Sequence, residues 1–303
     1  MDTDKRGDRG FLKKMSDIFG FLGLRLNFAL AKILPMPVMS LIFANVVVLL
    51  SPFMPKTYLI LKNLKNALPE LSYFERIRLM FKIWYNLGRF VGEYPHIYNF
   101  KEQEIFKYVS FDSRTKEILD ELKHMKTGSI LFSAHISNWE TLRALSDYGI
   151  RIGAVFRKLN NPFLEPKYSK NLRERVGMHM IAKQDNAAIN IIKSLKRGES
   201  VIILADQRDE MNGALVDFFG EKAYTIRSIY VLAKKLKVPV YGLRVIRDSR
   251  NPIKFSIKAE EKCQVSDDVS EERFLSTNIN GVIEKWIREN PEQWFWIHNR
   301  WKI

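Results

Sequence analysis

SILFSAHISNWETLRALSDYG, residues 129–149, carries the strongest structural signal in the chain. Its apolar first part is typical of a buried strand, and His135 stands where that strand ends. Ser137 followed three residues later by Glu140 is a capping-box pattern, which predicts that a helix begins at this point. The stretch therefore predicts a strand that leads into a helix, with a histidine at the junction.

A histidine at this junction has the surroundings of a general base. The partial positive charge of a helix N-terminus favours a neutral imidazole that can accept a proton. Glu140 could hold the other ring nitrogen of His135, which gives the pair of base and orienting acid that deprotonation of a hydroxyl requires. A purely structural pair, in which Glu140 caps the helix and His135 ends the strand, fits the spacing equally well. Because no GxSxG motif accompanies the histidine, direct attack by an acceptor hydroxyl is favoured over a covalent acyl-enzyme.

Further strands and helices alternate on the C-terminal side of this stretch. Apolar runs that end in polar residues occupy 152–157, 201–207 and 238–245, and helical patterns occupy 187–198 and 225–237. This alternation predicts an α/β fold, with a mostly parallel central sheet flanked by helices. Ligands of such sheets bind beyond the carboxyl ends of the strands. The polar residues expected there are His135, Arg157, Asp206 and Gln207.

The composition indicates an anionic partner. The 303 residues carry 49 Lys and Arg against 34 Asp and Glu, which is a net charge of +15. Nucleic acid, an anionic membrane, a phosphorylated lipid and an acidic carrier protein all fit this charge. A nucleic-acid-binding protein is disfavoured because the basic residues are dispersed and no helix-turn-helix, zinc-finger or RNP pattern is present.

Cysteine and histidine usage predicts no metal centre and no intramolecular disulfide. Cys263 is the single cysteine, and the five histidines show no metal-ligand spacing. A reducing compartment is expected.

The N-terminal region predicts association with a membrane. Residues 33–55 carry no charge, and the length of this stretch matches the roughly 20 residues that a spanning helix needs. Three prolines (35, 37 and 52) confine a clean helix to 38–51, a length closer to an interfacial or re-entrant helix. A buried helix of a soluble domain is the third possibility, and no cleavage site of a signal peptide follows.

A second helix is predicted between this region and the α/β part. Ser72 and Glu75 form a capping-box pattern, and apolar residues then recur at helical spacing to Val91. We expect this helix to pack on the α/β part; the alternative is a lipid-facing surface whose arginines contact anionic head groups.

Five motifs in order resemble those of the late acyltransferases of lipid A biosynthesis, within the wider lysophospholipid acyltransferase group. His135 to Glu140 resembles the family's histidine-x4-acidic motif, with Ser137 where glycine is usual. VFRKLNNPFLE (155–165) supplies Arg157, and NLRERVGMHMI (171–181) supplies Arg175 as the best match to an arginine before a glycine. The fourth motif is Asp206-Gln207 with FFGEKAYT (218–225), and the fifth is PEQWFWIHNRWK (291–302). Arg227, just after the fourth motif, stands where glycine is frequent in the family. The resemblance runs from about residue 16 to the end of the chain.

The resemblance implies acyl transfer from a thioester of acyl carrier protein or coenzyme A to a hydroxyl of an anionic glycolipid, a lipid A precursor. It implies a glycerol-phosphate acyltransferase-like fold and no cofactor beyond the thioester co-substrate. His135 would be the general base and Glu140 its orienting residue. The substrate-binding residues would be Arg157, Arg175, Asp206, Gln207 and Asn138. The enzyme would contact membrane lipids at the bacterial inner membrane, with its active site on the cytoplasmic face.

The predicted organisation has three parts. Residues 1–55 form a basic N-terminus and membrane anchor, 56–100 an amphipathic helical segment, and 101–303 the acyltransferase domain. Three alternatives stay open: an acyltransferase of the same mechanism for another glycolipid or phospholipid, a basic nucleic-acid-binding or membrane-binding protein that is not an enzyme, and a membrane scaffold without activity.

Overall fold

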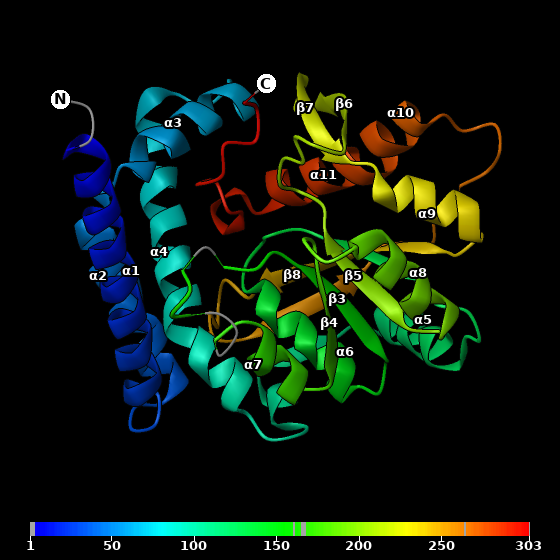
Figure 1. The fold of residues 1–303 in the computed structure, drawn as a ribbon, viewed down its shortest axis with the longest axis horizontal. Helices are drawn as coiled ribbons and strands as arrows, with labels where there is room; N and C mark the ends of the chain where they lie inside the picture. Colours follow the sequence, from blue (N-terminus) through cyan, green and yellow to red (C-terminus); the bar gives the residue numbers. More distant parts are fainter. Residues whose placement is uncertain (1–3, 160, 165–167, 264, 303) are drawn as a thin grey trace.

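Seven strands form the central sheet, in the order β1-β9-β8-β2-β5-β3-β4 (Figure 1). The structure, a computed structural model, describes residues 4–159, 161–164, 168–263 and 265–302, with side chains of the first helix described from residue 14. All pairs in the sheet are parallel except β8 with β9. The strands are β1 (Val109–Phe111), β2 (Ile130–Ser133), β3 (Ile152–Phe156), β4 (Met178–Ala182), β5 (Ser200–Leu204), β8 (Val240–Arg247) and β9 (Phe255–Ala259). The predicted α/β class with a mostly parallel sheet is confirmed.

Both faces of the sheet are buried, which explains why the strands read as continuous apolar runs. In β2, Ile130 and Phe132 belong to one core cluster, whereas Leu131 between them belongs to the other. The first cluster lies under α3 (Lys56–Ala67), α8 (Ala187–Lys196), α9 (Ser228–Leu236) and α11 (Gly281–Glu289). The second lies under α5 (Ser113–His124), α6 (Ala144–Asp147) and α7 (Lys170–Arg175).

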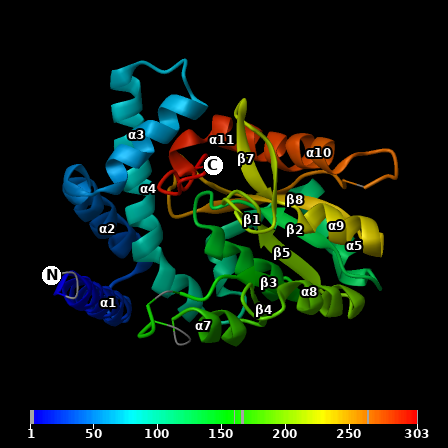
Figure 2. The same cartoon turned by 45° about the horizontal axis from the view of Figure 1, so that its top comes forward.

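A two-stranded hairpin and several short helices complete the α/β part. The hairpin of β6 (Gly213–Phe218) and β7 (Glu221–Ile226) stands apart from the main sheet, next to α11 (Figure 2). The short helices are η2 (Glu104–Lys107), η3 (Trp139–Arg143), α10 (Glu271–Arg273), η4 (Phe274–Asn280) and η5 (Pro291–Gln293).

Three helices stand side by side at the N-terminal side of the molecule (Figure 1). They are α1 (Asp4–Leu30), α2 (Met36–Leu50) and α4 (Tyr73–Asn99); the 3-10 turn η1 (Ser51–Phe53) and α3 connect α2 to α4. The predicted capping box at the start of α4 is present, with both of its hydrogen bonds between Ser72 and Glu75. Residues 36–53 are long and apolar enough to cross a membrane by composition, although α2 itself has 15 residues.

Two glycines allow α2 to approach α4 closely. A Cβ atom at Gly88 would lie 2.5 Å from the carbonyl oxygen of Phe43, and one at Gly92 would clash with the backbone of Met39. Since these neighbours are backbone atoms of a packed helix, they cannot move aside independently.

Replacement of Gly92 by alanine is therefore expected to destabilise the protein by about 1–3 kcal/mol through overpacking. Gly23 on α1 is the matched control, because a Cβ there meets no atom within 4 Å. Gly23→Ala is expected to be neutral or to stabilise by up to about 1 kcal/mol, because alanine favours the helix. Chemical unfolding of both variants in detergent checks the difference, and equal changes would contradict the close contact.

Candidate active site

The carboxyl ends of two neighbouring strands bring His135 and Asp206 together. The parallel register pairs Ser133 of β2 with Leu204 of β5, and each functional residue follows two positions later. The distance from His135 Nδ1 to Asp206 Oδ1 is 2.8 Å, and Trp294 donates its indole N–H to Asp206 Oδ2, also at 2.8 Å. A carboxylate at Nδ1 fixes the tautomer that carries the proton there, which leaves Nε2 free to accept one.

Asp206 is a buried, ionised partner for the histidine. Its exposed fraction is 2%, and burial alone would raise its pKa. The adjacent His135 ring and the hydrogen bonds from His135 and Trp294 outweigh burial and hold the pKa of Asp206 below its usual value. The carboxylate therefore keeps the negative charge that would stabilise an imidazolium.

The prediction that Glu140 orients His135 is wrong. Glu140 accepts hydrogen bonds from the Arg173 guanidinium, with Nε at 3.2 Å, and from the Tyr98 hydroxyl. The predicted capping box also fails, because Ser137 has a positive φ of 57° and makes no capping hydrogen bond. This left-handed residue breaks the helical turn that would have placed Glu140 beneath His135.

Glu140 and Arg173 form an ion pair in the same cavity as His135. The side chain of Glu140 is 7% exposed and that of Arg173 is 18% exposed. Burial raises the pKa of Tyr98 well above its ordinary value, and the charge of Glu140 raises it further, so this hydroxyl stays a neutral donor. The pair therefore holds the Arg173 guanidinium in a fixed position in the cavity, with its charge balanced by Glu140.

The cavity has a volume of about 480 Å³, within the range of small-molecule sites. Its polar lining includes His135, Glu140, Arg157, Arg173, Gln207 and Arg208. Its apolar lining includes Ala154, Met180 and Ile202, which are paired across β3, β4 and β5 and so share one face of the sheet. The arrangement suits a ligand with one reactive polar end and one apolar chain.

The other predicted substrate-binding residues divide between two places. Arg157 and Gln207 line the cavity, and the Gln207 amide nitrogen is 3.4 Å from His135 Nε2. Arg175 does not line the His135 cavity: Arg173 lines that cavity, whereas Arg175 lines a separate pocket, and its role in substrate binding stays a prediction. Two residues along a helix differ by about 200° in direction, so only one of them can face the site.

Asn138 is buried behind the site rather than exposed in it. Its amide donates to Glu93 Oε2 at 2.8 Å, and Glu93 also binds the Arg247 guanidinium at 2.6 and 2.9 Å. Ser40 of α2 donates to Glu93 Oε1 at 2.6 Å. Asn138 therefore secures the loop after His135 to α4, β8 and α2.

The C-terminal segment holds the same loop from the other side. Ser137 donates its backbone N–H to Gln293 at 2.7 Å, and Phe295 donates to the carbonyl of His135 at 3.0 Å. Trp294 and Trp296 are buried in the core. The C-terminal aromatic segment therefore holds His135 in position through these backbone hydrogen bonds. Trp294 also acts on His135 through Asp206, whose carboxylate it holds by a hydrogen bond.

His298 is a neutral hydrogen-bond acceptor in this region. Its Nε2 accepts the backbone N–H of Arg208 at 2.9 Å, and burial lowers the pKa of His298 to about 4. The unfolded chain protonates this ring near pH 6.5, so between pH 6.5 and 4 the unfolded state binds a proton that the folded state does not. The stability that depends on a neutral His298 is complete above pH 6.5 and falls below it.

We therefore expect wild-type protein to lose at most about 3 kcal/mol relative to His298→Gln as the pH falls from 6.5 to 4. Glutamine keeps an acceptor for the Arg208 N–H but does not titrate. Unfolding free energies of both proteins across this range check the prediction. Parallel pH dependence would show that His298 titrates normally in the folded state.

Comparison of the sequence with known proteins places this chain in a family. Residues 8–303 match the sequence model described as bacterial lipid A biosynthesis acyltransferase. The chain is similar to the lipid A biosynthesis palmitoleoyltransferase of Escherichia coli K12, with 25% identity over 273 residues, 89% of this chain and 86% of that protein. It is also similar to the lipid A biosynthesis lauroyltransferase of the same organism, with 25% identity over 247 residues, 80% of this chain and 77% of that protein.

Among solved structures, the 1-acyl-sn-glycerophosphate acyltransferase PlsC from Thermotoga maritima matches with a TM-score of 0.40 and 16% identity, over 90% of this chain and 97% of that one. The family model also matches almost the whole chain. This protein is therefore an acyltransferase that belongs to the bacterial lipid A biosynthesis acyltransferase family.

Proposed function

We propose that the protein transfers a fatty acyl chain from a thioester of acyl carrier protein or coenzyme A to a hydroxyl of a lipid A precursor. The observation that carries this proposal is the His135–Asp206 pair in a cavity that combines a cationic part with an apolar part. His135 Nε2 takes the proton of the acceptor hydroxyl while its oxygen attacks the thioester carbonyl. The tetrahedral intermediate then expels the thiol, which receives that proton from the imidazolium.

The cations of the cavity have two uses in this reaction. Arg173 is held by Glu140 and Ser169, whose hydroxyl accepts from its Nη1 at 3.1 Å, so it offers a preorganised charge for a developing oxyanion. Arg157 is exposed directly after β3, lines the cavity and is available to a phosphate or carboxylate of the substrate. The Gln207 amide is close enough to bind the same reacting groups.

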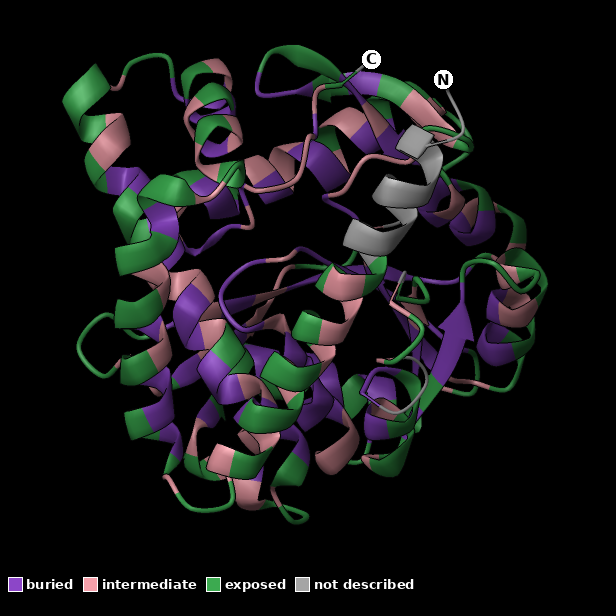
Figure 3. Ribbon diagram, turned by 60° about the vertical axis from the view of Figure 1, so that its left-hand side comes forward, coloured by how far each residue is buried: buried purple, intermediate pink, exposed green. Residues whose placement is uncertain are grey.

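We further propose that the protein lies at the cytoplasmic face of the inner membrane, with α1 and α2 as an inserted hairpin. A helix of 15 residues is about 22 Å long, which is shorter than the hydrocarbon core of about 30 Å. The outer surface of α2 exposes Leu41, Ile42, Val46 and Leu49, and exposed positions also run along α1 (Figure 3). A hairpin returns the chain to its starting side, so a cytoplasmic N-terminus and a cytoplasmic active site are compatible.

The test is acyl transfer by the purified full-length protein in detergent, followed by mass spectrometry of the lipid. Acyl carrier protein and coenzyme A thioesters are supplied separately, with a lipid A precursor as acceptor and a phospholipid acceptor as the comparison. A mass gain of one acyl chain on the lipid A precursor is the expected result, and the donor that supports it is identified at once. Transfer to the phospholipid alone would keep the reaction and reject the acceptor.

A further inference from the structure

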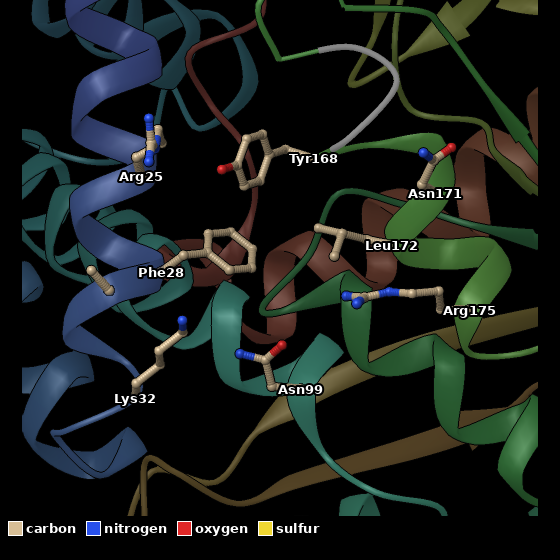
Figure 4. A pocket seen from close by; sticks show the side chains of 9 residues that line it. Arg25, Phe28, Lys32, Asn99, Tyr168, Asn171, Leu172 and Arg175 are labelled. Carbon is tan, nitrogen blue, oxygen red and sulfur yellow. The ribbon is translucent and has the colours of Figure 1, made fainter.

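A second cavity, of about 550 Å³, lies between α1, the C-terminal end of α4 and α7 (Figure 4). Positively charged side chains of α1, of the turn after it and of α7 surround the cavity, and apolar side chains form part of its wall. We call it the α1–α7 pocket, lined among others by Arg25, Phe28, Lys32, Asn99, Leu172 and Arg175. Among the described residues that line it, none is acidic.

The charges of the α1–α7 pocket are not neutralised within the described part of the chain. Arg25, Lys32 and Arg175 make no salt bridge to a described residue, and Glu174, the neighbour of Arg175, pairs with Lys170 instead. In the His135 cavity, by contrast, Arg173 and Arg208 each have a carboxylate partner. Three like charges around one cavity repel each other, and a bound anion removes this repulsion.

The side chains converge as a binding site requires. In Figure 4, Lys32 of the turn after α1, Asn99 of α4 and Arg175 of α7 extend their polar ends into the same part of the cavity. An arginine guanidinium binds phosphate through two parallel hydrogen bonds, and a lysine adds a point charge and an amide adds a donor. This set of donors suits a phosphate group.

The position of the α1–α7 pocket indicates that the anion belongs to a lipid. Arg25, Phe28 and Ala29 form one stripe of α1, which Lys32 continues just past the end of the helix. The exposed Leu22 and Leu26 form another stripe, about a quarter of a turn around the helix. An amphiphile whose chains contact the exposed apolar stripe would have its headgroup beside the cationic stripe. Phe28 and Leu172 then contact the apolar region that joins headgroup and chains.

The α1–α7 pocket is separate from the catalytic cavity but shares a helix with it. Ser169 and Arg173 line the His135 cavity, whereas Asn171, Leu172 and Arg175 line the α1–α7 pocket. We propose that the α1–α7 pocket binds the phosphate group of a lipid headgroup. The phosphate comes either from the acceptor glycolipid, in which case the inference rests on the proposed function, or from a surrounding phospholipid.

Calorimetric titration of the full-length protein in nonionic detergent tests this site directly. The probes are short-chain phosphatidic acid, short-chain phosphatidylcholine and inorganic phosphate. The variant is Lys32→Gln/Arg175→Gln, and the matched control is Lys116→Gln/Lys196→Gln, which removes the same charge from exposed positions of α5 and α8. All four residues are exposed, so these changes should leave the fold intact, and melting curves verify this.

Phosphatidic acid is expected to bind the wild type and the control equally, and to bind the pocket variant roughly 10- to 100-fold more weakly. Phosphatidylcholine is expected to show no such difference. Equal loss in both double variants would overturn the site, because the effect would then come from net charge alone. Inorganic phosphate that binds as tightly as phosphatidic acid would overturn the assignment to a lipid.

A second pair of titrations identifies the source of the phosphate. The lipid A precursor is compared with the same precursor after removal of its phosphate groups. If the acceptor supplies the phosphate, its removal weakens binding to the wild type but not to the pocket variant. If a phospholipid supplies the phosphate, the wild type and the pocket variant bind the two precursors equally well. The pocket variant still binds phosphatidic acid more weakly than the wild type does. Either result supports the site. Because no turnover is needed, a failed transfer reaction would reject the proposed function and leave this inference standing.

Discussion

Replacement of His135 by alanine is expected to slow acyl transfer by roughly 10²- to 10⁴-fold, the contribution of a general base. His135 is the imidazole at the polar end of the catalytic cavity, and its Nδ1 is held by Asp206 at 2.8 Å. Without the ring, the acceptor hydroxyl has no group of suitable basicity within reach. The measurement is the initial rate of transfer in detergent at saturating donor, with the melting temperature of the same preparation.

A second variant separates catalysis from folding. Alanine leaves the buried carboxylate of Asp206 without one of its two partners, which can lower stability. His135→Gln offers an amide that can still donate to Asp206 but cannot accept a proton at neutral pH. It is expected to be as inactive as the alanine variant while it melts closer to the wild type. Near-normal turnover by either variant would remove His135 as the base.

Replacement of Asp206 by asparagine is expected to slow transfer by a similar factor, on the order of 10²- to 10⁴-fold. An amide beside Nδ1 no longer favours the tautomer that leaves Nε2 free, and the imidazolium loses its counter-charge. Asparagine has nearly the same shape as aspartate, so packing around the buried position is preserved. The rate should fall chiefly in kcat, because the carboxylate acts through His135 and lies behind it.

The control for Asp206 is Trp294→Phe. It removes the second hydrogen bond to the carboxylate, at Oδ2, and leaves the pair with His135 in place. We expect Trp294→Phe to lower stability and to keep most of the activity, whereas Asp206→Asn loses the activity. Equal losses of kcat would indicate that Asp206 serves the fold through Trp294 rather than the reaction through His135.

The fold class could be predicted because the relevant signals are local. Apolar runs and helical spacing placed β2, β3, β5, β8, α8 and α9, and the capping box at Ser72 marked the start of α4. Strand β1 was missed because it has only three residues, β9 because polar residues alternate with its apolar ones, and β4 because His179 interrupts its apolar residues. The hairpin of β6 and β7 was missed because its alternation of exposed and buried residues is weak.

The partners within the site could not be predicted in the same way. Spacing suggested that Glu140 serves His135, but the left-handed Ser137 turns the segment and directs Glu140 toward Arg173. The string RER at 173–175 offered two arginines at similar distances from the glycine. Only the rotational position of α7 decides that Arg173 enters the cavity and that Arg175 faces α1.

The sequence alone determined the class of the fold, the position of His135 at a strand end and the family to which the motifs point. These properties depend on neighbours along the chain and on the order of motifs, both of which can be read in one dimension. Only the tertiary structure decided that Asp206, 71 residues away, is the partner of His135, and that Glu140 pairs with Arg173. The physical reason is that parallel pairing of β2 with β5 sets the first contact, and helix rotation sets the second.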